Sequence, residues 1–315
     1  MVHGVTLGRQ TPAGPDTCQP FVLAGGAIRG RLVRLSAAVD TILSRHSDPP
    51  LVAELLAESI VATVALASGL KYDGIFTLQV QGDGPVGTLV ADATSAGALR
   101  ACATYNAKRV QAVAIGGRPE HLQPHLLGAG HLAFTVDQGA DTERYQGIIA
   151  LTGGSLVDSV HEYFRQSEQL ASIIKINVSP PSAGRGWCAG GVLIQRMPAS
   201  LDLPQDEAED LWRTAAVFLG TVTAKELFDG AIDAPRLIRR IFGTLNCSVV
   251  EPKAYRAECR CTREKTSRIL ASFPVDDMRE YAVEGQLTMT CEFCRTVYSF
   301  SVDEIGAVQS DGAKQ

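Results

Sequence analysis

Two closely spaced cysteine pairs lie near the C-terminal end of the chain. Cys259 and Cys261 occur in "AECRCTREK", and Cys291 and Cys294 occur in "TCEFCRTVY". Four thiolates form a closed tetrahedral shell for zinc, at metal–sulfur distances near ~2.3 Å, and their softness suits this metal. The 29 residues between the pairs, 262–290, suit a helix with connecting strands. The spacing therefore predicts one zinc ion per chain, held by all four cysteines in a small C-terminal domain.

Whether such a zinc ion is permanent decides the function of this domain. Zinc contributes roughly 10–16 kcal/mol to the folding of a small metal domain, so a static zinc ribbon is the simpler interpretation. However, a C-x-C pair is uncommon in static ribbons, and thiols this close in sequence can also oxidise to local disulfides. Oxidation would remove the metal ligands and the main source of stability together. Arg260, Arg263 and Lys265 surround the first pair and are expected to favour thiolate character there.

The other four cysteines are isolated in the sequence: Cys18, Cys102, Cys188 and Cys247. An isolated cysteine is most often a small buried hydrophobic residue, and we interpret these four in that way. Cys18 lies in a polar tail, where simple exposure is the alternative. We expect all four to be dispensable for zinc binding and for oxidative switching.

Composition limits the classes of protein that the chain can belong to. Its 315 residues are 45% hydrophobic and 20% charged, which is enough to bury a sizeable core. The net charge of −5 argues against nucleic acid as the main partner, because phosphate binding needs a cationic surface. No run of 18 apolar residues and no signal-peptide core occur, so we expect a cytoplasmic protein without a membrane partner. In that compartment clustered cysteines indicate metal or redox chemistry.

Hydrophobic periodicity predicts a mixture of helices and antiparallel strands. Three strands at 74–81, 86–93 and 97–105 are separated by turn sequences and predict a meander, and 128–137 and 144–154 predict a further strand pair. The other predicted strands are 21–36 (broken at its glycines), 171–178 and 189–196, and the predicted helices are 36–46, 49–69, 155–170 (capped by Ser155), 205–228 and 234–243.

The predicted helix 205–228 carries an apolar stripe. It is formed by Leu211, Ala215, Phe218 and Val222, with Trp212 and Leu219 beside it. Such a stripe is most often core packing, and the sequence favours that interpretation. The alternative is an amphipathic segment that can detach and offer its apolar face to another molecule.

Motifs for catalysis or nucleotide binding are weak or absent. The stretch "GDGPVG" at 82–87 matches G-x-G-x-x-G, but it joins two predicted strands, and Pro85 removes one N–H group. It therefore predicts a hairpin turn. No phosphate-loop sequence and no G-x-S-x-G occur, so the sequence gives no indication of an enzyme.

Several stretches together resemble the redox-regulated 33-kDa heat-shock chaperone family of bacteria. They are "LQVQGDGPVGTLVADATSAGALRA", "GAGHLAFTVD", "YQGIIALTGGSLVDSVHEYFRQSEQ", "GGVLIQRMP", "CRCTREK" and "TCEFCRTVYSFS". The cysteine motif together with "EYFRQSEQ" is highly specific. After the second cysteine the family usually has serine, where this chain has Thr262, which leaves the ligands untouched.

The resemblance implies an α+β fold with separate functional regions. It implies an N-terminal α/β sandwich-like domain at 19–198 with antiparallel strands and helices, a helical linker at 199–249 and a zinc-binding redox-switch domain at 250–305. The ends of the chain fall outside the resemblance, and their sequences predict a flexible extension at 1–18 and a disordered tail at 306–315.

It also implies an ATP-independent holdase that is inactive when reduced and zinc-bound. Oxidation would form the disulfides Cys259–Cys261 and Cys291–Cys294, release zinc, unfold the terminal domain and linker, and expose a surface for unfolded client proteins. The active form in this family is often a homodimer.

Two other functions compete with this one. A zinc ribbon that binds nucleic acid is disfavoured by the net negative charge of the chain, and salt-dependent binding of RNA or DNA would support it. A thiol–disulfide oxidoreductase would use Cys291 and Cys294 catalytically, and would reduce insulin with turnover.

Overall fold

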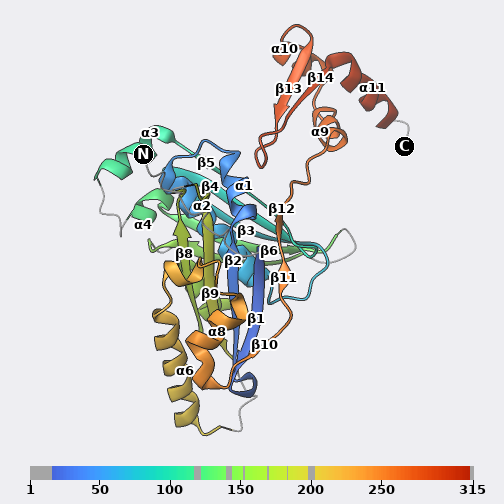
Figure 1. The fold of residues 1–315 in the computed structure, drawn as a ribbon. Helices are drawn as coiled ribbons and strands as arrows, with labels where there is room; N and C mark the ends of the chain where they lie inside the picture. The colour runs from blue at the N-terminus through green and yellow to red at the C-terminus, as the bar shows by residue number, and fades with distance from the viewer. Residues whose placement is uncertain are drawn as a thin grey trace, which may run out of the picture. The chain divides into compact units, whose positions relative to one another are not determined.

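The computed structural model describes residues 16–116, 122–139, 144–151, 153–168, 170–182, 184–197 and 203–312. The chain divides into two compact units, Met1–Ala257 and Glu258–Gln315, and most of their elements are labelled in Figure 1. Each unit is described by itself below.

The first sheet of the N-terminal unit is antiparallel and has the strand order β10-β1-β2-β9-β8, with β11 also paired to β1. Its strands are β1 (Thr17–Leu23), β2 (Ile28–Leu35), β8 (Ser172–Ser179), β9 (Cys188–Arg196), β10 (Ser248–Val249) and β11 (Lys253–Ala254). Strands β1 and β2 correspond to the predicted strand 21–36, which is interrupted at Gly25 and Gly26 as expected.

The second sheet has the order β12-β5-β4-β3-β6-β7 and is antiparallel except for the short pairing of β12 with β5. Its strands are β3 (Ile75–Gly82), β4 (Val86–Thr94), β5 (Ala98–Tyr105), β6 (Gly130–Asp137), β7 (Tyr145–Leu151) and β12 (Arg256–Ala257). The predicted meander and the predicted strand pair are therefore both confirmed.

Helix α2 (Pro50–Ala67) packs against strands of both sheets and forms the centre of the main core. By length and composition it is apolar enough to cross a membrane, but 78% of it is buried inside the protein. Burial between two sheets accounts for its apolar composition. The other helices of this region are α1 (Ala37–Ser44), α3 (Ala107–Gly116), α4 (Leu122–Leu127) and α5 (Leu156–Tyr163), followed by a π-helical turn (Phe164–Glu168).

The opposite face of the first sheet is covered by the predicted linker. This segment forms α6 (Gln205–Gly220), α7 (Ala224–Leu227) and α8 (Ala234–Phe242). The single predicted helix 205–228 is interrupted, because Thr223 and Glu226 form a capping box that begins a new helix. The stripe is core packing, as the sequence favours: Ala215, Leu219 and Val222 are buried, with Leu211, Trp212 and Phe218 packed against them.

The C-terminal unit is small and consists of three helices and one hairpin. These are α9 (Arg263–Leu270), α10 (Val275–Tyr281), β13 (Gln286–Thr290), β14 (Val297–Ser301) and α11 (Val302–Gly312). Its buried hydrophobic cluster has four members: Met278, Leu287, Phe300 and Ile305. Between the cysteine pairs the chain forms two helices, α9 and α10, and one strand, β13, so the predicted helix is confirmed, whereas the second strand of the hairpin, β14, follows the second pair.

Three predicted boundaries differ from the structure. The flexible extension 1–18 reaches too far, because Thr17 begins β1 and Cys18 is fully buried; residues 1–15 lie outside the described part. The predicted domain start at 250 is too early, because β11 and β12 pair with strands of the N-terminal unit. The disordered tail 306–315 is wrong as far as Gly312, because α11 buries Ile305, and Gln309 donates hydrogen bonds to two carbonyl groups.

Candidate metal centre

Two separate loops of the C-terminal unit carry the paired cysteines. Cys259 and Cys261 precede α9, which begins at the N-cap Thr262, whose hydroxyl accepts a hydrogen bond from the Lys265 N–H. Cys291 and Cys294 lie in the turn that joins β13 to β14. Within that turn the Cys291 N–H donates to the Thr296 carbonyl at 2.9 Å, so the hairpin fixes the second pair. We call these four residues the cysteine cluster.

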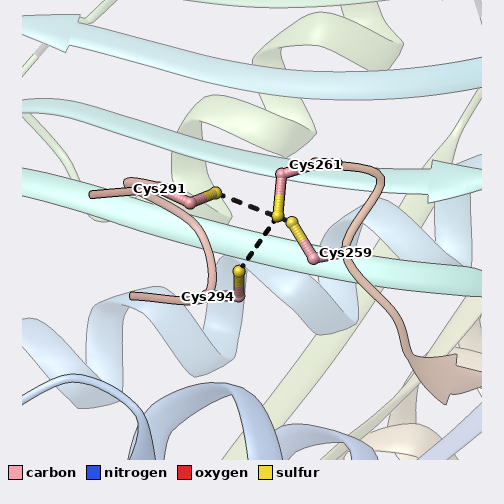
Figure 2. Close-up of side chains that lie close together, drawn as sticks. All are labelled: Cys259, Cys261, Cys291 and Cys294. Carbon is pink, nitrogen blue, oxygen red and sulfur yellow. Dashed lines mark hydrogen bonds between the residues drawn. The ribbon is translucent and has the colours of Figure 1, made fainter. Parts of the chain in front are cut away.

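The sulfurs of the cysteine cluster converge on one point, as Figure 2 shows. All four Sγ atoms lie within 4.8 Å of one another, and all four residues are partly buried. The separation is 3.7 Å between Cys259 and Cys291, and 3.3 Å between Cys261 and Cys294. A tetrahedral zinc–thiolate site has sulfur–sulfur separations of about 3.8 Å, from metal–sulfur bonds of about 2.3 Å. The arrangement could therefore hold a metal ion.

The thiols of the cysteine cluster differ in acidity. Burial raises the pKa of Cys261 to about 12 and also raises that of Cys291. Burial acts in the same direction on Cys294, but hydrogen bonds from Thr296 and contacts with Cys261 and Cys259 outweigh it and lower its pKa to about 6. Of these three thiols, Cys294 is the one whose surroundings favour the thiolate.

This order of acidity differs from the sequence interpretation, which placed thiolate character at the first pair because of three nearby cations. Arg263 instead binds both carboxylate oxygens of Glu304 at 2.9 Å and lies over the Phe300 ring. Lys265 donates to the Arg260 carbonyl. These side chains stabilise the loop and helix rather than the Cys261 thiolate.

Two hydroxyl groups next to the sulfurs were not identified from the sequence. The Tyr298 hydroxyl lies 3.2 Å from Sγ of Cys261, and the Thr296 hydroxyl lies 3.2 Å from Sγ of Cys294. Both residues follow the second cysteine pair in "CRTVYSF". Their proximity to that pair in sequence was a usable signal, but the contact of Tyr298 with the first pair depends on the folded hairpin.

The isolated cysteines all belong to the N-terminal unit. Cys18, Cys102 and Cys188 are buried and Cys247 is partly buried, so exposure of Cys18 is ruled out. Among the described residues, the cysteine cluster is the one group of three or more potential metal ligands that comes together. The four cysteines of the cluster are free thiols.

Two of the three glycines of "GDGPVG" have a packing role. The stretch forms the hairpin between β3 and β4, as predicted. A Cβ atom at Gly82 would lie 2.0 Å from the Leu127 carbonyl oxygen, and one at Gly84 would lie 2.4 Å from that of Leu126. Close approach of the end of α4 therefore accounts for both glycines without a bound phosphate.

The fold and this centre define a class: an α+β protein whose small, separate C-terminal unit is built around four cysteines. A family profile described as "Hsp33 protein" matches residues 16–301. The chain belongs to the Hsp33 family, which is a family of chaperones, and this confirms the resemblance noted in the sequence.

Relatives of known name agree with this assignment. The 33 kDa chaperonin of Caulobacter vibrioides is 34% identical over 287 residues, which are 90% of this chain and 94% of that protein. The 33 kDa chaperonin of Pseudomonas fluorescens is 32% identical, covering 92% and 93%. The crystal structure of the 33 kDa chaperonin (heat shock protein 33 homolog) from Thermotoga maritima matches with a TM-score of 0.78 over 96% of this chain and 100% of that chain. At 21% identity this last match establishes the fold.

Proposed function

We propose that this chain is a redox-regulated, ATP-independent holdase. It is zinc-bound and inactive when reduced, and it binds unfolded proteins after oxidation. The observation that carries the proposal is the convergence of four free thiols in a unit with a very small core. Zinc would be held by Cys259, Cys261, Cys291 and Cys294, and the donor set fits it because four thiolates satisfy its tetrahedral preference.

The size of the C-terminal unit supports a dependence on metal. It has 58 residues, 258–315, and its buried hydrophobic cluster has only four side chains among the described residues. Units below about 70–80 residues rarely reach stability from a hydrophobic core alone and usually need a metal or disulfides. Loss of zinc would therefore unfold this unit.

Oxidation is proposed to form the disulfides Cys259–Cys261 and Cys291–Cys294. Each disulfide arises from two thiols, whose two electrons and two protons reduce one molecule of a peroxide oxidant. Zinc leaves because its thiolate ligands are consumed. In the structure sulfurs of different pairs also lie close together, so the cross-pairing of Cys259 with Cys291 and of Cys261 with Cys294 is the competing outcome.

Tryptic mapping of the oxidised protein distinguishes the two pairings. Trypsin cleaves after Arg260, so a Cys259–Cys261 disulfide joins peptides 257–260 and 261–263. A Cys291–Cys294 disulfide stays within peptide 280–295 and lowers its mass by two hydrogens. Cross-pairing would instead join 280–295 to both short peptides, and finding that species as the product would contradict the proposed pairing.

The client-binding surface is proposed to include the interface between the linker and the first sheet. Leu219 and Phe242 are buried against Phe21 and Leu32 in one hydrophobic cluster. Detachment of the linker would expose apolar side chains on both partners. Unfolded proteins share exposed apolar groups rather than a sequence, so binding through such a surface would be broad.

The remaining expectations belong to the same proposal. The oxidised form would be a homodimer, the protein would act in the cytoplasm, and it would catalyse no reaction. The net charge of −5 supports a role without nucleic acid.

The main experiment compares zinc content with suppression of aggregation. Reduced and peroxide-treated protein are tested with an unrelated heat-unfolded enzyme, without ATP, and the treated sample is then returned to reductant and zinc. We expect suppression only after oxidation, together with zinc loss, and reversal by reductant and zinc. Equal suppression by both forms would show that the cysteines are only structural, and catalytic reduction of insulin would favour the oxidoreductase.

A further inference from the structure

A partly open cavity of about 120 Å³ lies in the N-terminal unit, and its lining includes no residue of the cysteine cluster. It is bounded by the end of α2, by strands β2, β3 and β9, and by the π-helical turn after α5. Much of its wall is apolar and includes Leu66, Phe76, Phe164 and Leu193. For comparison, an apolar cavity of about 150 Å³ is large enough to bind benzene. At about 120 Å³ the cavity is somewhat smaller than this, so it suits a small apolar body.

The polar side of this cavity is formed by Arg31, with Arg29 beside it. Arg31 is 9% exposed, and its Nη1 donates to Oε1 of Gln195 at 2.8 Å. Its Nε is buried and has no hydrogen-bond partner. The hydrogen bond to Gln195 does not use the Nε/Nη2 edge of the guanidinium. The two nitrogens of this edge have the spacing that binds a carboxylate with two parallel hydrogen bonds.

No carboxylate of the described residues balances this guanidinium. The ionisable groups that act on it are the Cys18 thiol, the Arg29 guanidinium and the Tyr255 hydroxyl. Arginine stays charged in proteins even when buried, and a buried charge without an opposite charge beside it is unfavourable. By contrast, Arg34 on the same strand donates to two backbone carbonyls and lies near acidic residues.

The turn after α2 leaves space for this arrangement. A Cβ atom at Gly69 would lie 2.7 Å from Nη2 of Arg31, so a side chain there would displace the guanidinium. The backbone of Gly69 does not require glycine, since its φ lies outside the left-handed region. The absent side chain thus leaves room for the arginine.

We propose that this cavity binds a small carboxylate with an apolar body, such as an arylacetate or a short fatty acid. The carboxylate would pair with the Nε/Nη2 edge of Arg31, and the apolar body would fill the space between Leu66, Phe76 and Leu193. An inorganic anion such as phosphate would satisfy the charge but would leave the apolar wall unfilled.

The test measures binding of phenylacetate and of hexanoate to the reduced, zinc-loaded full-length chain by calorimetry or ligand-observed NMR. We expect saturable binding, weaker or absent binding of the neutral analogue phenylacetamide, and no competition by inorganic phosphate at equal concentration. Arg31→Met should weaken carboxylate binding about tenfold or more, since hydrogen bonds to charged groups are among the stronger ones. The exposed Arg45 provides a control of equal charge change, Arg45→Met, which should bind as the wild type does.

A second variant keeps the test informative where Arg31→Met affects folding. Ala65 lines the cavity from α2, and Ala65→Leu should fill the space and abolish binding while leaving the guanidinium in place. Absence of carboxylate binding to the wild type, equal binding of phenylacetamide, or unchanged binding to folded Arg31→Met would each overturn the proposal.

Discussion

The hydroxyl of Tyr298 donates a hydrogen bond to Sγ of Cys261 across a distance of 3.2 Å. Tyr298 lies on β14, directly after the second cysteine pair, whereas Cys261 belongs to the first pair. The contact with Cys261 raises the pKa of Tyr298 to about 12, so the hydroxyl keeps its proton at neutral pH. It therefore acts as a donor that stabilises the Cys261 thiolate and connects the two halves of the cluster.

Tyr298→Phe should weaken zinc binding while leaving all four thiols in place. Loss of a hydrogen-bond partner to a metal ligand typically costs about 10–100-fold in metal affinity. Competition with a chromophoric chelator measures the effect. Tyr281→Phe is the matched control, because Tyr281 lies in the same unit and is 79% exposed. An affinity of Tyr298→Phe equal to that of the control would contradict a role for the hydroxyl.

Zinc affinity should rise with pH. At pH 7 Cys294, with its pKa lowered to about 6, is mostly a thiolate, whereas Cys261, with its pKa raised to about 12, holds a proton that zinc must displace. Protons thus compete with the metal, and below about pH 6 Cys294 also takes up a proton. Chelator competition between pH 6 and 9, and proton release when zinc is added to metal-free reduced protein, both measure this. An affinity independent of pH would contradict binding by thiolates.

Cys261→Ser should reduce the zinc content from about one ion per chain to a small fraction of that value. Its neighbour in the cluster, Cys294, would lose a sulfur contact at 3.3 Å, and a closed four-thiolate shell would no longer form. Metal analysis and hydrogen exchange over 258–312 provide the measurements. Cys247→Ser, outside the cluster, should retain its zinc, and undiminished zinc in Cys261→Ser would remove these residues as ligands.

Phe242→Ala should loosen the linker in the reduced protein. Phe242 is fully buried and stacks on Phe21 with ring centroids 5.3 Å apart. Truncation of a buried phenylalanine costs about 3–5 kcal/mol, so hydrogen exchange over 205–245 should increase and aggregation suppression should appear without oxidation. Val217→Ala is the control, because Val217 is 62% exposed on α6. Full protection of 205–245 in Phe242→Ala would show that this contact does not hold the linker.

Local patterns predicted most of the fold, and long-range pairing accounts for the differences. The helix around Ile60 has apolar residues on nearly every side, and the cysteine pairs have a spacing that few other structures use. Strands β10 to β12 have two residues each, which is too short for any periodicity, so their pairing with distant strands set a domain boundary that the sequence could not place. In the same way, Gln309 fixes the last helix through carbonyls some 36 to 38 positions away.

The four cysteine ligands of the candidate site could be predicted from the sequence, but their surroundings could not. Cys259 and Cys261 are close in sequence, so their common role is local information. The Tyr298 contact depends on how the β13–β14 hairpin places its side chains against the other loop, and the low pKa of Cys294 depends on hydrogen bonds from Thr296. The lack of a carboxylate beside Arg31 could not be predicted from the sequence either, because the strand "IRGRLVRL" contains three arginines with different surroundings.

The two large hydrophobic clusters of the N-terminal unit have no buried residue in common. The cluster around α2 holds the two sheets together, whereas the other attaches the linker to the far face of the first sheet. If the linker leaves as proposed, the sheet that it covered loses the short edge strand β10 but keeps β1, β2, β9 and β8 in their order, and it keeps its second face. On inactivation the linker would then bind to a sheet that is already folded. This step resembles the docking of a peptide on a folded partner, because the N-terminal unit does not have to refold.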